Sequence, residues 1–410
     1  MNTKAEPVLD QTAIEEMPAF AEVMPRVAAE YGKSLPGQLS DMLTYCLRGN
    51  RLSVDEYYNL CLFDDKAWSV EEKKRVIGVR KNLAICTHFN RSNPWSTVVD
   101  DKLAFEKMLA GFGYRTTRTL AVFGGRYPDG ETRRLDDEAG LADFLAVAAF
   151  PIFGKPSDSA RSMGAVRITG FDRASGTISL AGGRIVELSD FVAEIRDKFG
   201  GVYLFQECIE AHPDLAAICG GGLPTVRFVT LDRGEGPEIF RIAVKLTGGG
   251  NAADNFWRKG NLIAPIDAGT GLMGKAATSM GINGERVSHH PDTGAAIEGV
   301  ALPYFEQARD LALDAARLLE GSLLLGFDIA IDANGPLIIE ANPTPHLVMM
   351  EVSHGKGILD EHMIAAMAYL NRIVDERKQR LKEQVRADRK KNKQDVMAAL
   401  HSGQGKNKAA

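Results

Sequence analysis

One segment of this 410-residue chain, LLLGFDIAIDANGPLIIEANPTPH from Leu323 to His346, restricts the fold more than any other. Side chains alternate along a strand, so Asp328 and Phe327 face opposite ways. An odd-length loop would place Asp328 opposite Glu340, and Ala333-Asn334-Gly335 suits such a loop because glycine supplies the left-handed position. The segment therefore predicts an antiparallel hairpin with one apolar face and one acidic face.

The acidic face of this hairpin presents three oxygen-bearing side chains, Asp328, Glu340 and Asn342. A few hard oxygen ligands, with positions left for water and phosphate, suit Mg²⁺ or Mn²⁺. A solvated acidic face is the ordinary alternative, but it does not explain why Pro343 and Pro345 stiffen the backbone just past these residues. We therefore predict a metal site formed by Asp328, Glu340 and Asn342.

The composition excludes several classes of protein. Lys and Arg number 49 against 54 Asp and Glu, a formal net charge of −5, and 45% of residues are hydrophobic. These values argue against a disordered chain and against nucleic-acid binding driven by overall positive charge. No apolar run reaches the roughly 20 residues that span a bilayer, and the N-terminus has no apolar signal region, so we expect a cytoplasmic protein. The five cysteines are widely spaced and never form a CxxC pair, so neither a disulfide framework nor a zinc knuckle is predicted.

The pattern of apolar residues divides the chain into three parts. Residues up to about 89 place apolar side chains three and four apart, which predicts helices, two of them capped by Ser53 and Ser69. From residue 97, short β-rich runs alternate with turns and with helical stretches at 138–149 and 303–321, an order typical of an α+β domain. We therefore predict a helical region at 1–96, an α+β domain at 97–374 and a basic helical or disordered tail at 375–410.

Charge is distributed unevenly along the chain. Residues 375–410 carry 11 basic and 5 acidic side chains, a net of +6, so the remaining 374 residues carry −11. A solvated helix that frays is the ordinary interpretation of this tail. Contact of the tail with an acidic partner or membrane surface is the alternative.

A second motif, FPIFGKPSDSARSMGAVRI, places Lys155 at the end of an apolar strand and before a loop of small and polar residues. The GxxxxGK[ST] pattern is missing, so the segment is not a P-loop. We predict that this loop joins two strands and folds over phosphates as a lid. The candidate phosphate ligands are Lys155, Ser157, Ser159, Arg161 and Ser162. A surface lysine before a polar loop is the alternative for Lys155.

Polar residues also follow the apolar strand in GVYLFQECIEAHPDL. Gln206, Glu207 and the backbone of Ile209 are candidates for hydrogen bonds to an adenine edge, and Asp214 for the ribose hydroxyls. A strand end with solvent-facing polar residues is the alternative.

Two cations are expected on strands among apolar neighbours, Arg227 in PTVRFVTL and Lys245 in EIFRIAVKL. A charge that faces inward there is costly unless it is paired. A bound phosphate or carboxylate and an ordinary salt bridge are both suitable partners. Asp254 and Asn255, in a glycine-rich run nearby, are further candidates for polar contacts in a pocket.

The order of these motifs resembles the ATP-grasp fold over about residues 97–374. In detail, TVRFVT, the Asp254-Asn255 pair, HHPDTGAAIEGVALPYFEQA and LGFDIAIDANGPLIIEANPTPH resemble the sugar-transfer-associated ATP-grasp group. Phe327 stands where that group often has Trp, and Ala341 where it often has Gly; both changes leave the candidate ligands in place.

The resemblance implies two α+β subdomains that hold ATP between them, with a lid subdomain at about 150–210. It implies ATP-dependent ligation of a small-molecule carboxylate to an amine or similar nucleophile through an acyl phosphate, in polysaccharide or specialised-metabolite biosynthesis. By this resemblance Lys155 contacts the α- and β-phosphates, and Asp328, Glu340 and Asn342 bind Mg²⁺. Arg227 and Lys245 are candidates to neutralise the transferred phosphate. The adenine contacts are Gln206, Glu207, Cys208 and Ile209.

Two other functions stay open. One is an ATP-grasp phosphotransferase that acts on a small-molecule hydroxyl, and the other is a nucleotide-binding scaffold without turnover, against which the intact candidate ligands argue. A homo-oligomer also stays open. The candidate bases for an incoming amine are His289, His290, His346 and His354.

Overall fold

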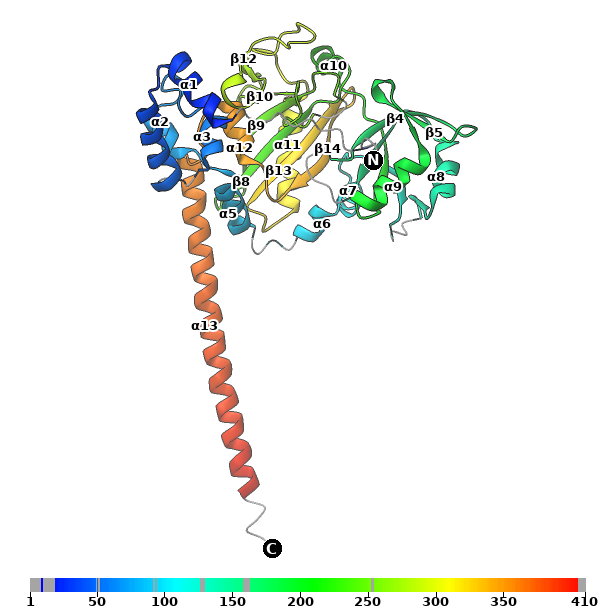
Figure 1. The fold of residues 1–410 in the computed structure, drawn as a ribbon. Coiled ribbons are helices and arrows are strands. Elements are labelled where there is room, and N and C mark those ends of the chain that lie inside the picture. The colour runs from blue at the N-terminus through cyan, green and yellow to red at the C-terminus, as the bar shows by residue number, and fades with distance from the viewer. Residues whose placement is uncertain are drawn as a thin grey trace, which may run out of the picture. The chain divides into compact units, whose positions relative to one another are not determined.

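The computed structural model describes residues 9, 19–48, 50, 52–90, 93, 95–125, 130–157, 163–251 and 254–404 (Figure 1). The chain divides into two compact units, Met1–Asp360 and Glu361–Ala410. This division falls at residue 360, and the boundaries at 96/97 and 374/375 stay predictions. No helix in the described part of the chain is both long and apolar enough to cross a membrane.

The elements of the described residues between Phe20 and Gly111 are helices, as the apolar spacing predicts. The serine caps are confirmed: Ser53 accepts the N–H of Glu56 in a capping box, and Ser69 accepts the N–H of Glu72. The elements are α1 (Phe20–Tyr31), α2 (Leu35–Met42), a π-helix (Leu43–Arg48), α3 (Val54–Asn59), α4 (Val70–Arg75), α5 (Val79–Phe89), α6 (Ser96–Asp100) and α7 (Lys102–Gly111).

Among the described residues the strands form two seven-stranded sheets, and the α+β class is thereby confirmed. The first sheet has the order β2-β1-β7-β3-β4-β5-β6. Its buried core includes Phe191, Tyr203 and Phe205, whose rings contact one another. Its elements are β1 (Thr119–Phe123), β2 (Arg133–Leu135), α8 (Glu138–Leu145), β3 (Ile152–Pro156), β4 (Val166–Asp172), β5 (Thr177–Leu180), a 3₁₀ turn (Ala181–Gly183), β6 (Ile185–Glu187), α9 (Leu188–Lys198) and β7 (Tyr203–Glu207).

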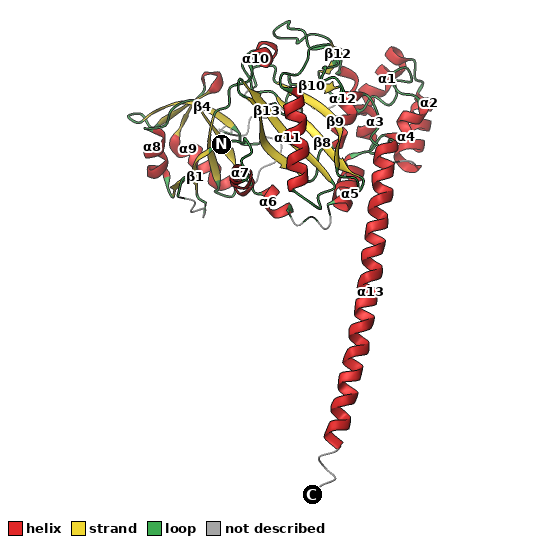
Figure 2. Ribbon diagram, turned by 180° about the vertical axis from the view of Figure 1, so that it is seen from behind, coloured by secondary structure: helices red, strands yellow, loops and turns green. Residues whose placement is uncertain are grey.

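The second sheet has the order β12-β11-β10-β9-β8-β13-β14, and α11 lies across one of its faces (Figure 2). On α11, Ala308, Ala312 and Ala315 are fully buried against strand residues that include Phe228 and Phe327. The elements are α10 (Pro213–Cys219), β8 (Thr225–Asp232), β9 (Pro237–Leu246), β10 (Leu262–Ile266), β11 (Ala276–Ala277), a 3₁₀ turn (Gly281–Asn283), β12 (Arg286–Val287), α11 (Phe305–Leu318), β13 (Leu324–Asp332), β14 (Gly335–Asn342) and α12 (Leu347–His354).

The predicted acid hairpin is present as β13 and β14, and Asp328 pairs with Glu340 as expected. The expected three-residue loop is wrong, because Asp332 already pairs with Gly335 across a two-residue loop. A bulge at Ile339 restores the parity: Ile329 pairs with Ile338, so one extra residue separates the two halves of the ladder. Gly335 has a φ of 115°, a conformation that favours glycine.

Eight strands overlap the β-rich runs that the sequence pattern indicates, namely β1, β3, β4, β7, β8, β9, β13 and β14. Sequence analysis missed β2, β5, β6, β10, β11 and β12, which have two to five residues each and too few alternations to show a period. The second compact unit contains α13 (Glu361–Gln404), which confirms the helical pattern expected near the C-terminus.

Glu351 on α12 links the helical N-terminal region to the second half of the chain. Its Oε1 accepts the N–H groups of Ile77 (2.9 Å) and Ile358 (3.0 Å), whereas its Oε2 has no hydrogen-bond partner among the described residues. Burial raises the pKa of Glu351 well above its usual range. The folded protein therefore holds a proton on Glu351 at pH values where the unfolded chain has lost it.

Because of this difference in bound protons, the contribution of Glu351 to the unfolding free energy falls as pH rises above about 4.3, by up to about 1.4 kcal/mol per pH unit. Glu351→Gln keeps an oxygen acceptor for both amides and removes the titration. We predict that E351Q gains stability relative to the natural chain between about pH 5 and about pH 8, as measured by urea unfolding. A stability difference that does not vary with pH would contradict the assignment.

Candidate functional site

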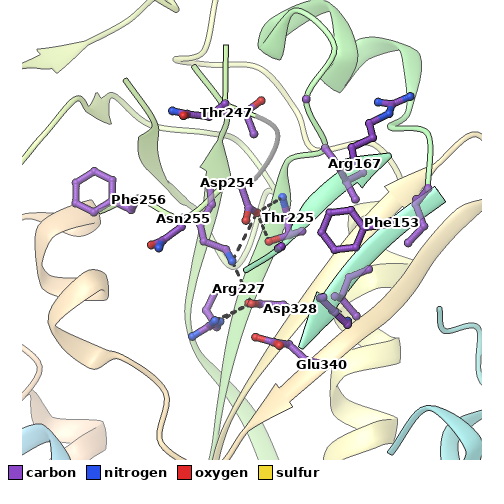
Figure 3. Close-up of a pocket in the computed structure, with 18 of the residues that line it drawn as sticks. Phe153, Arg167, Thr225, Arg227, Thr247, Asp254, Asn255, Phe256, Asp328 and Glu340 are labelled. Atoms are coloured by element: carbon purple, nitrogen blue, oxygen red, sulfur yellow. Dashed lines mark hydrogen bonds and ion pairs between the residues drawn. The ribbon is translucent and has the colours of Figure 1, made fainter. Parts of the chain in front are cut away.

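A cavity of about 920 Å³ lies between residues of the two sheets and collects most of the candidate site residues. The first sheet contributes Lys155 on β3 and Gln206 on β7. The second sheet contributes Arg227 on β8, Lys245 on β9 and the acid hairpin. Figure 3 shows the Arg227–Asp328 pair with Phe153 and Arg167 to one side and Asn255 and Phe256 to the other.

A chain of alternating charges forms the centre of this cavity. Arg227 contacts Asp328 with Nε and with Nη2 (2.7 Å to Oδ2), and Lys245 Nζ lies 3.0 Å from the same Oδ2. Lys245 Nζ also lies 3.5 Å from Asp254 Oδ2, which accepts the N–H and the hydroxyl of Thr225. All four charged residues are less than 9% exposed.

The electrostatics of Asp328 follow from its partners. Burial alone would raise the pKa of this carboxyl, but the charges of Arg227 and Lys245 and their hydrogen bonds hold it well below its usual range. Burial would likewise lower the pKa of Lys245, and the carboxylates of Asp254 and Asp328 outweigh that effect and raise it. Asp328 is therefore ionised and paired.

Strand register places these groups. Asp328 on β13 is the direct cross-strand partner of Arg227 on β8, and Lys245 on β9 is the partner of Thr225. Gly326 makes room for the arginine, because a Cβ at this position would lie 3.0 Å from Arg227 Cδ.

One candidate metal ligand, Asp328, belongs to this charge chain, and the other two, Glu340 and Asn342, lie on the paired strand β14. Asp328, Glu340 and Asn342 all line the cavity, and Asn342 Nδ2 donates to Glu340 Oε1 (3.2 Å). Because Asn342 donates through Nδ2, its amide oxygen is available to bind a metal ion. Two carboxylates and an amide oxygen fit a hard divalent cation, although the described residues contain no cluster of three or more His, Cys, Asp or Glu side chains that would hold one by itself.

Lys155 lines the cavity and is 8% exposed, and burial lowers its pKa to about 8. Sequence analysis missed a second lysine, Lys102, in the first turn of α7, which also lines the cavity and donates to the carbonyl oxygen of Ser157 (3.1 Å). Nothing local marks Lys102 in the sequence, since a lysine in a first helical turn is ordinary. Ser157 does not line the cavity, and Ser159, Arg161 and Ser162 lie outside the described residues.

The candidate adenine contacts Gln206, Glu207, Cys208 and Ile209 all line the cavity. The side chain of Gln206 is turned into a buried network, where its Nε2 donates to Glu106 Oε2 (2.7 Å) and approaches the hydroxyls of Thr117 (3.0 Å) and Thr119 (3.1 Å). Asp214, the candidate ribose contact, lies in the first turn of α10 outside the cavity lining.

Phe153 and Arg167 are cavity residues that sequence analysis did not identify. They are cross-strand partners on β3 and β4, so their side chains lie on one face of the first sheet. The pairing register of β3 and β4 brings them together, and this register has no signal in the sequence.

The candidate histidines separate into two groups. His346 lines the cavity, and its ring lies 5.2 Å from that of Trp257. Both ring nitrogens of buried His290 contact backbone, Nδ1 with the N–H of Asp292 and Nε2 with the carbonyl of Thr247. Burial lowers the pKa of His354 to about 4, and neither His354 nor His289 lines the cavity.

The two carboxylates of the candidate metal site differ in their structural roles, which predicts different effects on stability. Asp328→Asn leaves Arg227 and Lys245 buried against a neutral amide, so we expect the unfolding free energy to fall by about 3 kcal/mol. Glu340→Gln is the matched control, because Glu340 accepts its hydrogen bond from Asn342 rather than from a cation; we expect a change below about 1 kcal/mol. Chemical denaturation without added metal or nucleotide measures both, and equal losses would contradict the role of Asp328.

Comparison with solved structures finds chains of low sequence identity. A D-alanine–D-alanine ligase from Bacillus anthracis, solved in complex with ATP, has a TM-score of 0.36 and 14% identity over 67% of this chain and 68% of that one. An L-amino acid ligase from Bacillus licheniformis has a TM-score of 0.36 and 13% identity over 66% and 48%. An N5-carboxyaminoimidazole ribonucleotide synthetase from Thermotoga maritima has a TM-score of 0.35 and 13% identity over 66% and 49%. The matched part thus spans about half the length of the last two chains.

Among curated proteins no sequence matches this chain significantly. The sequence model of one family, described as sugar-transfer associated ATP-grasp, matches residues 174–365. This match covers β8, β9, β13 and β14, which carry the charge chain and the candidate metal ligands. The resemblance expected from the motifs is therefore confirmed: over residues 174–365 this chain is similar to the sugar-transfer associated ATP-grasp family.

Proposed function

We propose that this protein is an ATP- and Mg²⁺-dependent ligase, which activates a small-molecule carboxylate as an acyl phosphate for attack by an amine or similar nucleophile. One observation carries the proposal: two buried cations, Arg227 and Lys245, converge on Asp328 beside Glu340 and Asn342, in a cavity between two sheets. The family match over the same strands supports the use of ATP.

The chemistry requires such a cluster. When a carboxylate oxygen attacks the γ-phosphorus, two negatively charged groups approach each other, so positive charge must be fixed at that point beforehand. Arg227 and Lys245 are held by Asp328 and Asp254 within a strand register, so they do not have to reorganise during the reaction. Mg²⁺ held by Asp328, Glu340 and Asn342 would add charge neutralisation at the phosphate oxygens.

Other cavity residues take the remaining tasks. Lys155 and Lys102 line the cavity on the side of the first sheet and are suited to the α- and β-phosphates. The backbone of Glu207 and Ile209 is suited to the adenine edge, and Phe153 to packing against the base.

The proposed ligation has two steps. A carboxylate oxygen forms a bond to the γ-phosphorus and ADP leaves; the amine nitrogen then forms a bond to the acyl carbon, and phosphate leaves with that carboxylate oxygen. We therefore predict that a substrate labelled with ¹⁸O in its carboxylate transfers one labelled oxygen to each phosphate released, as measured by mass spectrometry. A stable phosphorylated product with unlabelled phosphate would instead establish a hydroxyl phosphotransferase and refute the ligase.

Glu340→Gln, which we expect to fold normally, should lower ADP release at least about a hundredfold.

The lowered pKa of Lys155 predicts a pH dependence of nucleotide binding. Before nucleotide binds, Lys155 loses its proton as pH rises through about 8, and the neutral amine no longer attracts phosphate. The affinity for ATP should therefore decline between about pH 7 and about pH 9, by up to roughly tenfold, in isothermal titration calorimetry. Lys155→Arg keeps the charge and should bind ATP equally at both pH values; the same decline in this variant would show that another group titrates.

A further inference from the structure

Charge is divided between the two ends of the cavity. Its Lys and Arg side chains in the described lining are Lys102, Lys155, Arg167, Arg227 and Lys245, which lie at the first sheet or at the charge chain. The opposite end, which we call the loop end, is formed by residues 220–223, 247, 248, 250, 251 and 255–257 together with Asp292, Thr293 and His346. In Figure 3, Thr247, Asn255 and Phe256 lie on this side of Asp254, away from Arg167.

The polar side chains of the loop end are carboxylates, amides and hydroxyls. Asp292, Asn251 and Asn255 line it, and no lysine or arginine does so among the described residues. Thr247, a residue 1% exposed, also lines the cavity and carries a hydroxyl. This set offers acceptors and neutral donors, and it lacks a fixed cation.

Two backbone amides at the loop end already have hydrogen-bond partners within the protein. The turn at Gly248 and Gly249 would be a natural place to bind an anion, but the N–H of Gly248 donates to Asn261 Oδ1 (3.0 Å) and that of Gly249 to Asp292 Oδ2 (2.6 Å). At this turn a carboxylate or phosphate on a ligand would therefore meet Asp292, and neither of these two amides is available to offset the repulsion.

Two aromatic rings give the loop end an apolar surface. The rings of Phe256 and Trp257 lie 5.9 Å apart, and the Trp257 ring also contacts His346. A partly exposed tryptophan beside amide and carboxylate side chains suits a ligand whose carbon skeleton packs on the ring while its polar groups form hydrogen bonds.

We propose that the loop end binds the nucleophile of the ligation, and that this nucleophile is an amine whose other polar groups are hydroxyls or a second ammonium, and not a carboxylate or phosphate. This inference rests on the proposed function. The amine nitrogen forms a bond to the acyl carbon, phosphate leaves with the carboxylate oxygen, and the proton lost from the nitrogen passes to solvent. Asp292 binds the ammonium or hydroxyl group, and the nucleophile reaches the reacting carbon from the side opposite the nucleotide.

The test compares amines that differ only in an acidic group. The pairs are serinol and serine, putrescine and ornithine, and glucosamine and glucosamine 6-phosphate, each supplied with a carboxylate that supports ADP release. We expect kcat/KM for the member without the acidic group to exceed that of its partner at least tenfold. Equal or reversed preferences, or a protein that uses no amine lacking an acidic group, would overturn the inference.

A variant tests the role of Asp292 separately. Asp292→Asn keeps an oxygen acceptor for the Gly249 amide and removes the charge, so it should fold with an unchanged Tm and reduce the preference for putrescine over ornithine about tenfold. Asp197→Asn, at an exposed position of α9 and outside the cavity lining, is the matched control and should change nothing. An unaltered preference in D292N would exclude Asp292 as the recognition group.

The outcomes separate this inference from the proposed function. If no carboxylate transfers ¹⁸O to phosphate, the ligase assignment fails, and this inference fails with it. If the label is transferred but amines with acidic groups are preferred, the ligase assignment stands and only the nature of the nucleophile is wrong.

Discussion

The buried ion pairs of Asp328 are the interaction on which the rest of the site depends. Removing a carboxylate, a guanidinium and an ammonium from water is costly, and their attraction offsets this cost only when the geometry and the additional hydrogen bonds are good. Here Arg227 contacts both oxygens of Asp328, and Lys245 bridges Asp328 to Asp254. The site therefore holds Arg227 and Lys245 in place, each paired with a buried carboxylate.

The second sheet can carry this arrangement because its two faces have separate tasks. One face packs Phe228, Val244 and Phe327 into the core beneath α11, and the alternation of side chains then directs Arg227 and Asp328 to the other face. The same packing that stabilises the strands thus fixes the register of the charges. A shift of one residue between β8 and β13 would expose the core residues, so the ion pairs are protected by hydrophobic burial.

Residues far from the reacting groups support the acid hairpin and the strand of the candidate adenine contacts. Asn90, at the end of α5, donates to the carbonyls of Leu324 and Pro343, which lie at the open ends of the acid hairpin. Glu106 on α7 accepts hydrogen bonds from Thr117, Thr119 and Gln206 and so orders the strand that carries the candidate adenine contacts. The helical N-terminal region is therefore part of the support of the site, a role that its amphipathic pattern did not reveal.

The sequence by itself determined the acid hairpin and which side chains share its acidic face, because side-chain alternation is a local property that can be counted along the chain. The predicted pairing of Asp328 with Glu340 is correct. The predicted three-residue loop is wrong, because the bulge at Ile339 cannot be recognised without the partner strand. The sequence left two kinds of partner open for Arg227 and Lys245, a bound phosphate or carboxylate and an ordinary salt bridge. Only the tertiary structure decided that both pair with Asp328, because the strand order β9-β8-β13 joins residues about a hundred positions apart. For the same reason, only the structure assigns four further residues to the cavity, because this cavity exists only once distant strands and loops have packed together. These residues are Lys102, Phe153, Arg167 and Asp292.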